Sequence, residues 1–405
     1  MRDTRGALSP LAANSLLVLA AVVGSLLLCE LLLRLLGVSY PVLDWTDPVR
    51  GVAFIPGAKS APRKDGGSTI EINSDGRRGP ETTIARKPGT YRIALIGDSF
   101  VAGFDVRFEA TAGEVLARRL TALRGSPVEV LNFGHGGYGT TQEYLTLKHE
   151  VWKYSPDLVL LGVTTGNDIS DNYRALKRSD YIPYFVYQGD QLVLDTTFRQ
   201  APGYSSRTFW TRKFLGVVQY SRLAQLINRS RHLQRRTERN QRNKGDDPED
   251  EVGLRDEVQL PPSTPEWKEA WRVTEGVLVL MRDECRKHDT PFGVVTLTRG
   301  IQVSPSKEKK AEFLRQLGAT DMFYPERRIA ELGKREDIPV LNLAPPMAKE
   351  AEERQVYFHS FNGEMGVGHW NQEGNRAAGE LIAAWVATQF MDRKTMEGRA
   401  PHAAR

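Results

Sequence analysis

Five short apolar segments, separated by stretches with helical periodicity, limit the folds that most of this chain can adopt. The segments cover residues 91–96, 128–132, 158–163, 292–297 and 340–343. The third is nearly all apolar, as is usual for a strand buried on both faces of a sheet. Amphipathic stretches at 112–123, 140–154, 266–288 and 374–391 follow the segments. Strands that alternate with helices predict a parallel sheet in a layered α/β domain over residues 91–391.

The N-terminus carries a long apolar run. Residues 16–29 contain no charge, and the wider stretch 8–37 has only Glu30 and Arg34 as charged interruptions. A membrane-spanning helix needs about 20 mostly apolar residues. Arg2 and Arg5 precede the run, which favours a cytoplasmic N-terminus. No small-x-small cleavage site follows closely, so residues 1–38 are predicted to be a cytoplasmic stub and an uncleaved signal anchor; a cleaved signal peptide is the alternative.

Three other parts flank or interrupt the α/β domain. Residues 39–90 are rich in Pro, Gly and Arg and are predicted to be a linker or N-terminal extension. A charged insertion at about 200–262 includes residues 229–244, with seven Arg or Lys against one Glu, and 246–257, with seven acids against one Arg. A helix end running into a solvated loop is the simpler interpretation. The alternative is a lid, or a docking site for a polymer or a lipid head group. Residues 392–405 are predicted to be a disordered tail.

Composition excludes several classes of protein. The two cysteines, Cys29 in the apolar run and Cys285 in a predicted helix, rule out a disulfide framework or a cysteine zinc module. The net charge of +5 comes from scattered basic residues, so we expect no nucleic-acid partner. No His/Asp/Glu spacing resembles a metal site, and 97–103 lacks the Gly-Lys-Ser/Thr of a phosphate loop. We therefore expect no metal and no cofactor.

Four segments carry candidate chemistry. Ser99 follows the first strand in Gly-Asp-Ser, and in a parallel sheet active residues gather at the carboxyl ends of strands. The second strand ends in Asn-Phe-Gly-His-Gly-Gly-Tyr-Gly-Thr, which includes Gly137, and the third in Gly-Val-Thr-Thr-Gly-Asn-Asp, which includes Asn167. Gly-His-Trp-Asn, with His369, precedes the last helix. Alone, Gly-Asp-Ser would as readily be a strand-end turn with a helix cap.

In this order, the four segments resemble the sequence blocks of the SGNH hydrolase superfamily, the GDSL-type esterases, over roughly residues 88–390. The resemblance implies a flavodoxin-like three-layer α/β/α sandwich with a central parallel sheet of about five strands. It implies that Ser99 is the nucleophile and His369 the general base. It places the oxyanion hole at the amides of Ser99 and Gly137 and the side chain of Asn167.

The chemistry of these residue types supports the roles. A serine hydroxyl is a weak nucleophile without an adjacent base, and a histidine has a pKa suited to taking its proton near neutrality. One oxyanion-hole donor typically lowers the barrier by about 3–4 kcal/mol. The chain departs from the family pattern at the triad acid, because Gly366 and Val367 stand where an Asp usually precedes the histidine. Glu364 is the nearest candidate acid. The alternatives are a backbone carbonyl that orients the ring, or loss of activity.

These features together predict a serine esterase that cleaves acyl esters, including acetyl esters, through an acyl-enzyme. It would lie in the cell membrane as a single-pass protein with its catalytic domain outside the cytoplasm, in the periplasm. The expected partner is an acyl-ester substrate, with a lipid or a polysaccharide as candidates. The alternatives are an O-acyltransferase that modifies an envelope polysaccharide and a non-catalytic carbohydrate-binding relative.

Overall fold

The computed structural model describes residues 9–60, 69–242, 255–361 and 363–391. Three predictions concern residues outside these ranges. They are the basic stub that contains Arg2 and Arg5, the middle of the charged insertion, and the tail at 392–405.

The five predicted strands form one parallel sheet, which confirms the predicted α/β fold class. They are β3 (Tyr91–Gly97), β4 (Val128–Gly134), β5 (Leu158–Thr164), β8 (Phe292–Leu297) and β9 (Val340–Asn342). Their order is β4-β3-β5-β8-β9, with Ile93 of β3 opposite Val130 on one side and Leu158 on the other. This is the flavodoxin-like order, in which the chain crosses to the other side of its first strand after the second. The crevice that results opens at the carboxyl end of β3, where Ser99 follows.

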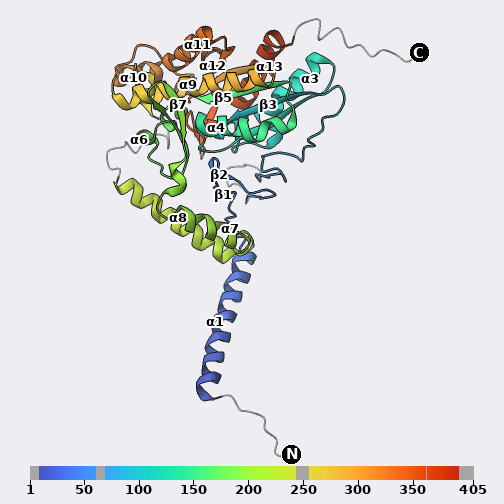
Figure 1. Cartoon of the computed structure of the whole chain (residues 1–405), viewed down its shortest axis with the longest axis vertical. Helices are drawn as coiled ribbons and strands as arrows, with labels where there is room; N and C mark the ends of the chain where they lie inside the picture. The colour runs from blue at the N-terminus through green and yellow to red at the C-terminus, as the bar shows by residue number, and fades with distance from the viewer. Residues whose placement is uncertain (1–8, 61–68, 243–254, 362, 392–405) are drawn as a thin grey trace, which may run out of the picture.

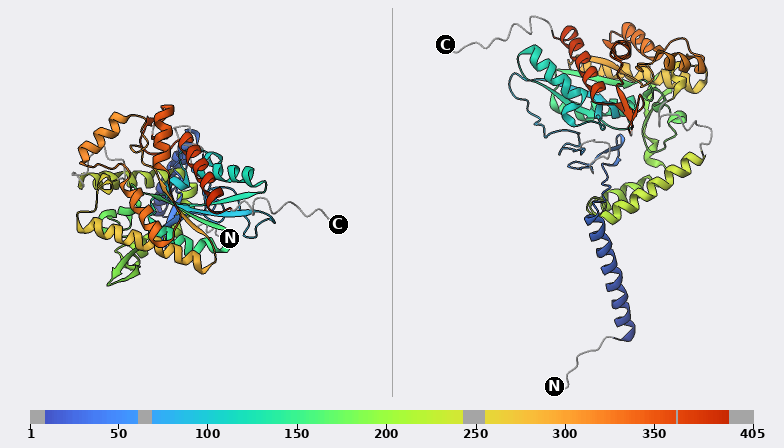
Figure 2. Two further views of the ribbon diagram at one scale, coloured as in Figure 1. Left: turned by 90° about the horizontal axis from the view of Figure 1, so that it is seen from above. Right: turned by 180° about the vertical axis from the view of Figure 1, so that it is seen from behind.

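Helices cover both faces of the sheet (Figures 1 and 2). One face packs against α3 (Ala112–Arg124), α12 (Ala344–Arg354) and α13 (Gln372–Gln389). The other packs against α4 (Thr140–Thr146), α9 (Pro265–Lys287) and α11 (Tyr324–Glu336). Alternate residues of each strand face opposite layers, so Ile93 joins one core cluster and Ala94 the other. A glycine allows α3 and α13 to approach closely, since a Cβ on Gly379 would lie 2.5 Å from Val115.

Shorter elements lie around the ends of the strands. The helices are α2 (Ser99–Ala102), α5 (Asp168–Asp171), α6 (Arg174–Lys177) and α10 (Lys307–Leu317). An antiparallel sheet of β10 (His359–Phe361), β11 (Glu364–Met365) and β12 (His369–Trp370) precedes α13, with the order β11-β10-β12. This small sheet carries His369.

The N-terminal extension packs against the domain. Strands β1 (Asp44–Asp47) and β2 (Gly51–Phe54) form a hairpin. The apolar side chains Phe54, Ile55, Ala58, Ile70 and Ile72 form a cluster that also contacts Phe104, in the loop after Ser99. This segment is therefore part of the surroundings of the site.

Between β5 and β8 the chain forms elements that the sequence patterns did not indicate, which include the hairpin of β6 (Tyr184–Gln188) and β7 (Gln191–Asp195) and the helix α7 (Tyr204–Tyr220). The next helix, α8 (Arg222–Arg242), covers the basic part of the charged insertion, where a helix end was predicted. In Figure 1, α7 and α8 lie where α1 (Pro10–Leu35) leaves the body of the molecule. Among the described residues, α1 is the one helix long and apolar enough to cross a membrane, and none of its residues is buried.

Candidate active site

Ser99 is the first residue of α2, and one residue, Asp98, separates it from the end of strand β3. Asp98 caps this short helix, because its carboxylate accepts a hydrogen bond of 2.9 Å from the N–H of Phe100. Gly97 makes the tight turn possible, since a Cβ there would lie 2.4 Å from a methyl carbon of Val101. Gly103 ends the helix with a left-handed φ of 66°. The serine is thereby held at the switch point of the sheet with the amides of a helix start around it.

The structure brings Ser99 and His369 together. The Nε2 atom of His369 lies 2.8 Å from the Ser99 Oγ atom, at hydrogen-bond distance. On the other side of the ring, Nδ1 lies 2.8 Å from Oδ2 of Asp105. The ring of Phe100 packs edge-on against the imidazole, with centroids 4.9 Å apart. A serine, a histidine and an aspartate in this sequence of contacts have the geometry of a catalytic triad.

Asp105 corrects the expectation for Glu364. Glu364 lies on β11, where it is exposed, while Asp105 occupies the position beside Nδ1 that the sequence prediction assigned to Glu364. The acid comes from the loop that follows the nucleophile, six residues after Ser99, and not from the segment before His369. Its one sequence signal was the dipeptide Phe-Asp directly after Gly103, the glycine that ends the nucleophile helix.

Arg78 holds the loop that carries Asp105. Its guanidinium is buried, with an exposed fraction of 3%, and donates hydrogen bonds to three backbone carbonyls. The acceptors are Ala102 at 2.6 Å, Gly103, and Val106 at 2.7 Å. They lie on both sides of Asp105 in the chain, so the N-terminal extension helps to position the acid of the triad.

The predicted oxyanion-hole residues lie after the carboxyl ends of three neighbouring strands, β3, β4 and β5. The loop after β4 passes beside the nucleophile, since a Cβ on Gly136 would lie 3.9 Å from the Cβ of Ser99. The next residue, Gly137, has a φ of 79°, a conformation that favours glycine. Asn167 is the N-cap residue of α5, and its Nδ2 atom lies 3.4 Å from the Asp98 carboxylate. An amide nitrogen has two N–H groups, so the second of these remains for a substrate oxygen.

A second histidine supports the strand that carries His369. The Nδ1 atom of His359 lies 2.6 Å from the carbonyl oxygen of Gly368, so this nitrogen carries the proton. Its Nε2 atom lies 2.8 Å from the Thr298 hydroxyl, which accepts a hydrogen bond of 2.7 Å from the indole of Trp370. Burial lowers the pKa of His359 to about 4, so the ring stays neutral at ordinary pH. His359 thus fixes the residues on both sides of His369.

Buried carboxyl groups lie behind the oxyanion-hole residues. Burial raises the pKa values of Glu143 and Asp168 well above their ordinary range, and mutual repulsion with Asp98 adds to the rise. Burial also raises the pKa of Asp171 to about 6, although Lys177 pairs with it and opposes the rise. Neither carboxylate oxygen of Glu143 has a hydrogen-bond partner among the described residues. Glu143 therefore keeps its proton to a higher pH than an exposed glutamic acid does.

No cluster of three or more His, Cys, Asp or Glu side chains with metal-binding geometry occurs within the described ranges.

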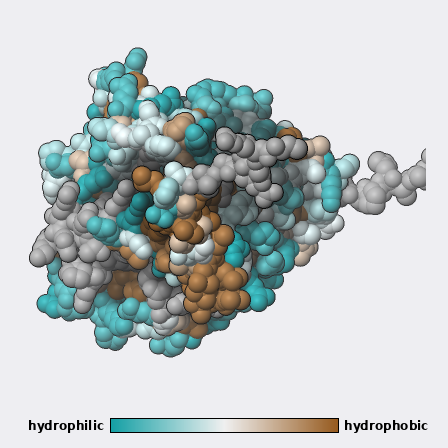
Figure 3. Space-filling model, turned by 90° about the horizontal axis from the view of Figure 1, so that it is seen from below, coloured by the Kyte–Doolittle hydropathy of each residue, from teal (hydrophilic) through white to brown (hydrophobic). Residues whose placement is uncertain are grey.

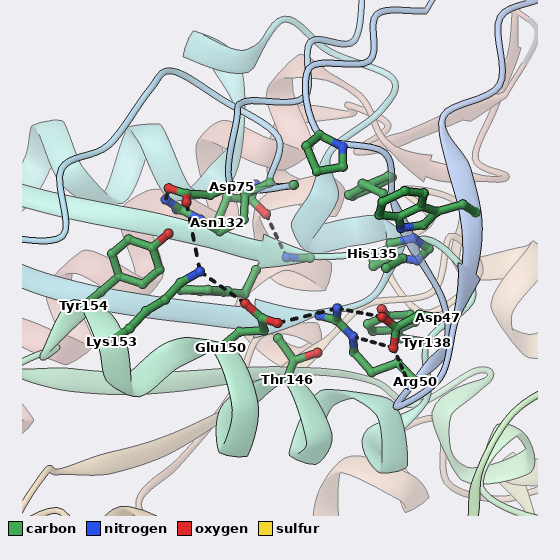
Figure 4. A pocket seen from close by; sticks show the side chains of 18 residues that line it. Asp47, Arg50, Asp75, Asn132, His135, Tyr138, Thr146, Glu150, Lys153 and Tyr154 are labelled. Carbon is green, nitrogen blue, oxygen red and sulfur yellow. Dashed lines mark hydrogen bonds and ion pairs between the residues drawn. The ribbon is translucent and has the colours of Figure 1, made fainter. Parts of the chain in front are cut away.

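A cavity of about 190 Å³, lined by both charged and apolar side chains, lies between the N-terminal hairpin and the loop after β4. Figure 4 shows Arg50 between Asp47 and Glu150, and Lys153 between Glu150 and Asp75. Most of the charges that line the cavity are thus paired with one another. The cavity separates the N-terminal hairpin from the sheet and does not include Ser99.

No protein-family model and no curated protein matches the chain. Solved structures similar to it include a protein assigned to the G-D-S-L lipolytic family from Desulfitobacterium hafniense DCB-2, 12% identical over 72% of this chain and 98% of the other, with a TM-score of 0.33. A lipase/acylhydrolase from Enterococcus faecalis is 14% identical over 74% of this chain and 96% of the other, with a TM-score of 0.35. A variant of an acetyl-xylooligosaccharide esterase from Geobacillus Stearmophilus is 11% identical over 76% and 99%, with a TM-score of 0.38.

At these identities and TM-scores the likeness carries no argument about activity. The chemistry of this chain follows from its own residues.

Proposed function

We propose that this protein is a serine esterase that forms an acyl-enzyme at Ser99. The observation that carries the proposal is the chain of contacts from Ser99 Oγ to His369 Nε2 at 2.8 Å, and from His369 Nδ1 to Asp105 Oδ2 at 2.8 Å. His369 takes the proton of the serine hydroxyl as the oxygen attacks the ester carbonyl. Asp105 orients the ring and stabilises the imidazolium that forms.

The negative charge of the tetrahedral intermediate would lie among the amides of Ser99 and Gly137 and the side chain of Asn167. When the intermediate collapses, His369 returns its proton to the leaving alcohol, and the acyl group remains on Ser99. A water molecule or another hydroxyl then accepts the acyl group by the same steps in reverse. Hydrolysis and O-acyl transfer therefore share the acyl-enzyme and differ only in the acceptor. The non-catalytic alternative depended on the absence of a triad acid, and Asp105 removes that reason.

We also propose that α1 is a single-pass anchor that holds the domain outside the cytoplasm. Its length and apolar surface support a membrane span. The side of the membrane rests on Arg2 and Arg5 and the tendency of basic flanks to stay in the cytoplasm.

A fluorophosphonate probe tests the catalytic proposal, because it reacts only with an activated serine. The full-length chain in detergent should form a covalent adduct on the peptide that contains Ser99. The Ser99→Ala variant should form none, and His369→Ala should react far more slowly. A folded unmodified chain that never reacts, or a Ser99→Ala variant that still does, would overturn the proposal.

A further inference from the structure

Helix α7 carries a row of large apolar side chains that nothing in the described chain covers. Phe209, Trp210, Phe214, Val217 and Tyr220 have exposed fractions between 42% and 77%. Trp210 stacks on Phe214, with ring centroids 4.9 Å apart, and packs edge-on against Phe209 at 5.2 Å. Positions 210, 214 and 217 follow one another at helical spacing, so they share one face. We call these five residues the α7 patch. An exposed apolar patch of this kind marks a surface that binds something.

The α7 patch has a fixed place next to the end of α1. The Glu30 carboxylate of α1 accepts hydrogen bonds of 3.0 Å from the Ser221 hydroxyl and from the N–H groups of Arg222 and Leu223, and so caps α8. Arg34 donates a hydrogen bond of 2.5 Å to the carbonyl of Tyr220. These contacts explain the two charged residues in the apolar run. They connect α1 to the junction of α7 and α8.

The apolar surface of α1 continues onto α7 and α8. An open groove between them is lined by Val23, Leu26, Leu27, Val217, Tyr220 and Leu223. Figure 3 views the molecule from the α1 end, where apolar surface gathers in the middle of a largely hydrophilic face. Helix α1 has 26 residues and is about 39 Å long at a rise of 1.5 Å per residue, against about 30 Å for a hydrocarbon core. Its last turns, where α7 is attached, are therefore at the level of the lipid head groups.

The charged side chains of α7 and of most of α8 are all basic. From Tyr204 to Thr237 the sequence contains eight Arg or Lys and no acidic residue. Arg212, Lys213 and Arg229 are exposed. Cationic residues beside apolar and aromatic ones are typical of helices that lie in the surface of an anionic membrane. Trp and Tyr side chains favour this same interface.

We propose that α7 and the first turns of α8 lie in the lipid–water interface and bind anionic phospholipids. This inference rests on the proposed anchor and adds a second contact with the same bilayer. The contact would orient the catalytic domain, since Arg212 of α7 lies over the ring of Trp45 in β1, 5.4 Å from its centroid. Asp44 of the same strand lies 3.2 Å from Nε2 of His135, in the loop beside Ser99. These contacts would connect the bilayer to the active-site loop through α7 and the N-terminal hairpin.

Spin labels on the full-length chain test the inference. Single cysteines replace Phe214 in the α7 patch, Leu19 in the middle of α1, and Leu123 on α3, in a Cys29→Ser background; Cys285 is buried. Leu123 is the matched control, since it is an exposed apolar helix residue outside the α7 patch. Each protein is placed in nanodiscs that hold one copy, so a second copy cannot cover the label. Collision rates with oxygen, which enters lipid, and with a nickel chelate, which stays in water, are then compared.

We expect the label at 214 to lose accessibility to the nickel chelate relative to the label at 123, and to gain oxygen accessibility, as the label at 19 does. If the label at 214 has the accessibilities of the label at 123 while the label at 19 is in lipid, the anchor stands and the inference about α7 is wrong. If the label at 19 also has the accessibilities of the label at 123, the proposed anchor itself is wrong. The loss at 214 should be larger in discs with phosphatidylglycerol than in discs of phosphatidylcholine alone, and this difference should disappear in Arg212→Glu/Lys213→Glu. Equal losses in both kinds of disc would contradict the role of anionic lipid.

Discussion

At the scale of single residues, the proposed role of Asp105 is to hold the ring of His369, so we expect Asp105→Asn to be severely impaired. In a serine protease triad, the same exchange lowers kcat on the order of 10⁴-fold, because asparagine holds the imidazole in the wrong tautomer. Asp105 lies 2.8 Å from Nδ1 of His369, and we expect a loss of comparable size. The measurement is kcat/KM on a short-chain aryl ester.

Glu364→Gln is the matched control, because it makes the same chemical change on an exposed acid. We expect its kcat/KM to stay within about twofold of the unmodified chain, the size of a typical surface effect. Thermal melts should be similar for both variants. A severe loss in Glu364→Gln, or a mild one in Asp105→Asn, would return the role of the acid to Glu364.

Sequence reasoning singled out Ser99 and His369, which the structure places at hydrogen-bond distance, because each stands in a distinctive block, but it did not single out Asp105. In a sequence, the acid of a triad is recognised by its spacing from the histidine. In the folded chain, any acid whose carboxylate lies beside Nδ1 of the histidine can take this role. Here that distance depends on Arg78, which holds three carbonyls around the Asp105 loop from a segment more than twenty residues upstream. A contact of this kind leaves no periodic pattern.

Glu143 gives a prediction for the pH dependence of stability. Its pKa in the folded chain is raised by burial, so the folded chain keeps a proton that the unfolded chain releases above its ordinary pKa of 4.5. Stability is therefore lost as the pH rises from 4.5 towards the raised pKa, by up to about 1.4 kcal/mol per pH unit for one group. Glu143→Gln keeps the shape of the neutral acid and removes this loss.

We thus expect the variant to gain stability over the unmodified chain as the pH rises from about 5 to about 8, in urea unfolding followed by fluorescence. Asp98, Asp168 and Asp171 titrate in both proteins, so only the difference between the two curves is informative. A constant difference across this range would show that Glu143 is already charged in the folded chain.

At the scale of elements, Arg78 connects the N-terminal extension to the nucleophile loop. Arg78→Met keeps a long apolar stem but leaves the carbonyls of Ala102 and Val106 without a donor, while that of Gly103 keeps its hydrogen bond from the N–H of Val106. Each buried group left unpaired costs about 1–3 kcal/mol. We expect a lower midpoint of thermal unfolding, and also a fall in kcat that exceeds any change in KM, because Asp105 loses its position. Arg78→Lys should restore part of both.

Arg86→Met is the control, since Arg86 lies in the same extension but is exposed, with 42% of its side chain accessible, and pairs with Asp157. It should change neither quantity appreciably. An Arg78→Met variant that melts earlier yet keeps its kcat would mean that Arg78 supports the fold without positioning the triad.

The elements differ in how well their sequences predict them. The strands of the main sheet carry apolar runs such as Leu158–Thr164, in which every residue is buried. A short run of this kind buries all its side chains as a strand covered on both faces of a sheet. Helix α7 lacks this signal, because its apolar residues are exposed and its neighbours are basic. Propensity alone does not separate such a helix from a charged loop. Its contacts with α1, through Glu30 and Arg34, appear only in three dimensions.

At the scale of the whole molecule, the arrangement in Figure 1 separates a long apolar helix from a polar catalytic domain, with α7 and α8 at their junction. Such a division suits a protein that acts close to a bilayer. A substrate within reach would be an ester at the membrane or in the polymer layer next to it. The site is partly open, since the exposed fraction of the His369 side chain is 32%, so a bulky acyl acceptor could approach the acyl-enzyme.

The proposed orientation of the chain in the membrane, which rests on Arg2 and Arg5, can be tested on the intact chain. We expect a full-length fusion with a C-terminal phosphatase, which is active only outside the cytoplasm, to show activity and to stay with the membranes after an alkaline carbonate wash. Replacing Leu19 and Leu26 with Arg should abolish both, because a charge near the centre of a spanning helix costs about 2.5–3.5 kcal/mol on insertion scales. Replacing the exposed Ile84 and Leu123 with Arg is the matched control and should change neither.

Activity of a cytoplasmic reporter in place of the phosphatase would reverse the orientation. A mature chain whose N-terminus lies beyond Gly37 would show that α1 is removed, and with it the anchor on which the α7 contact depends.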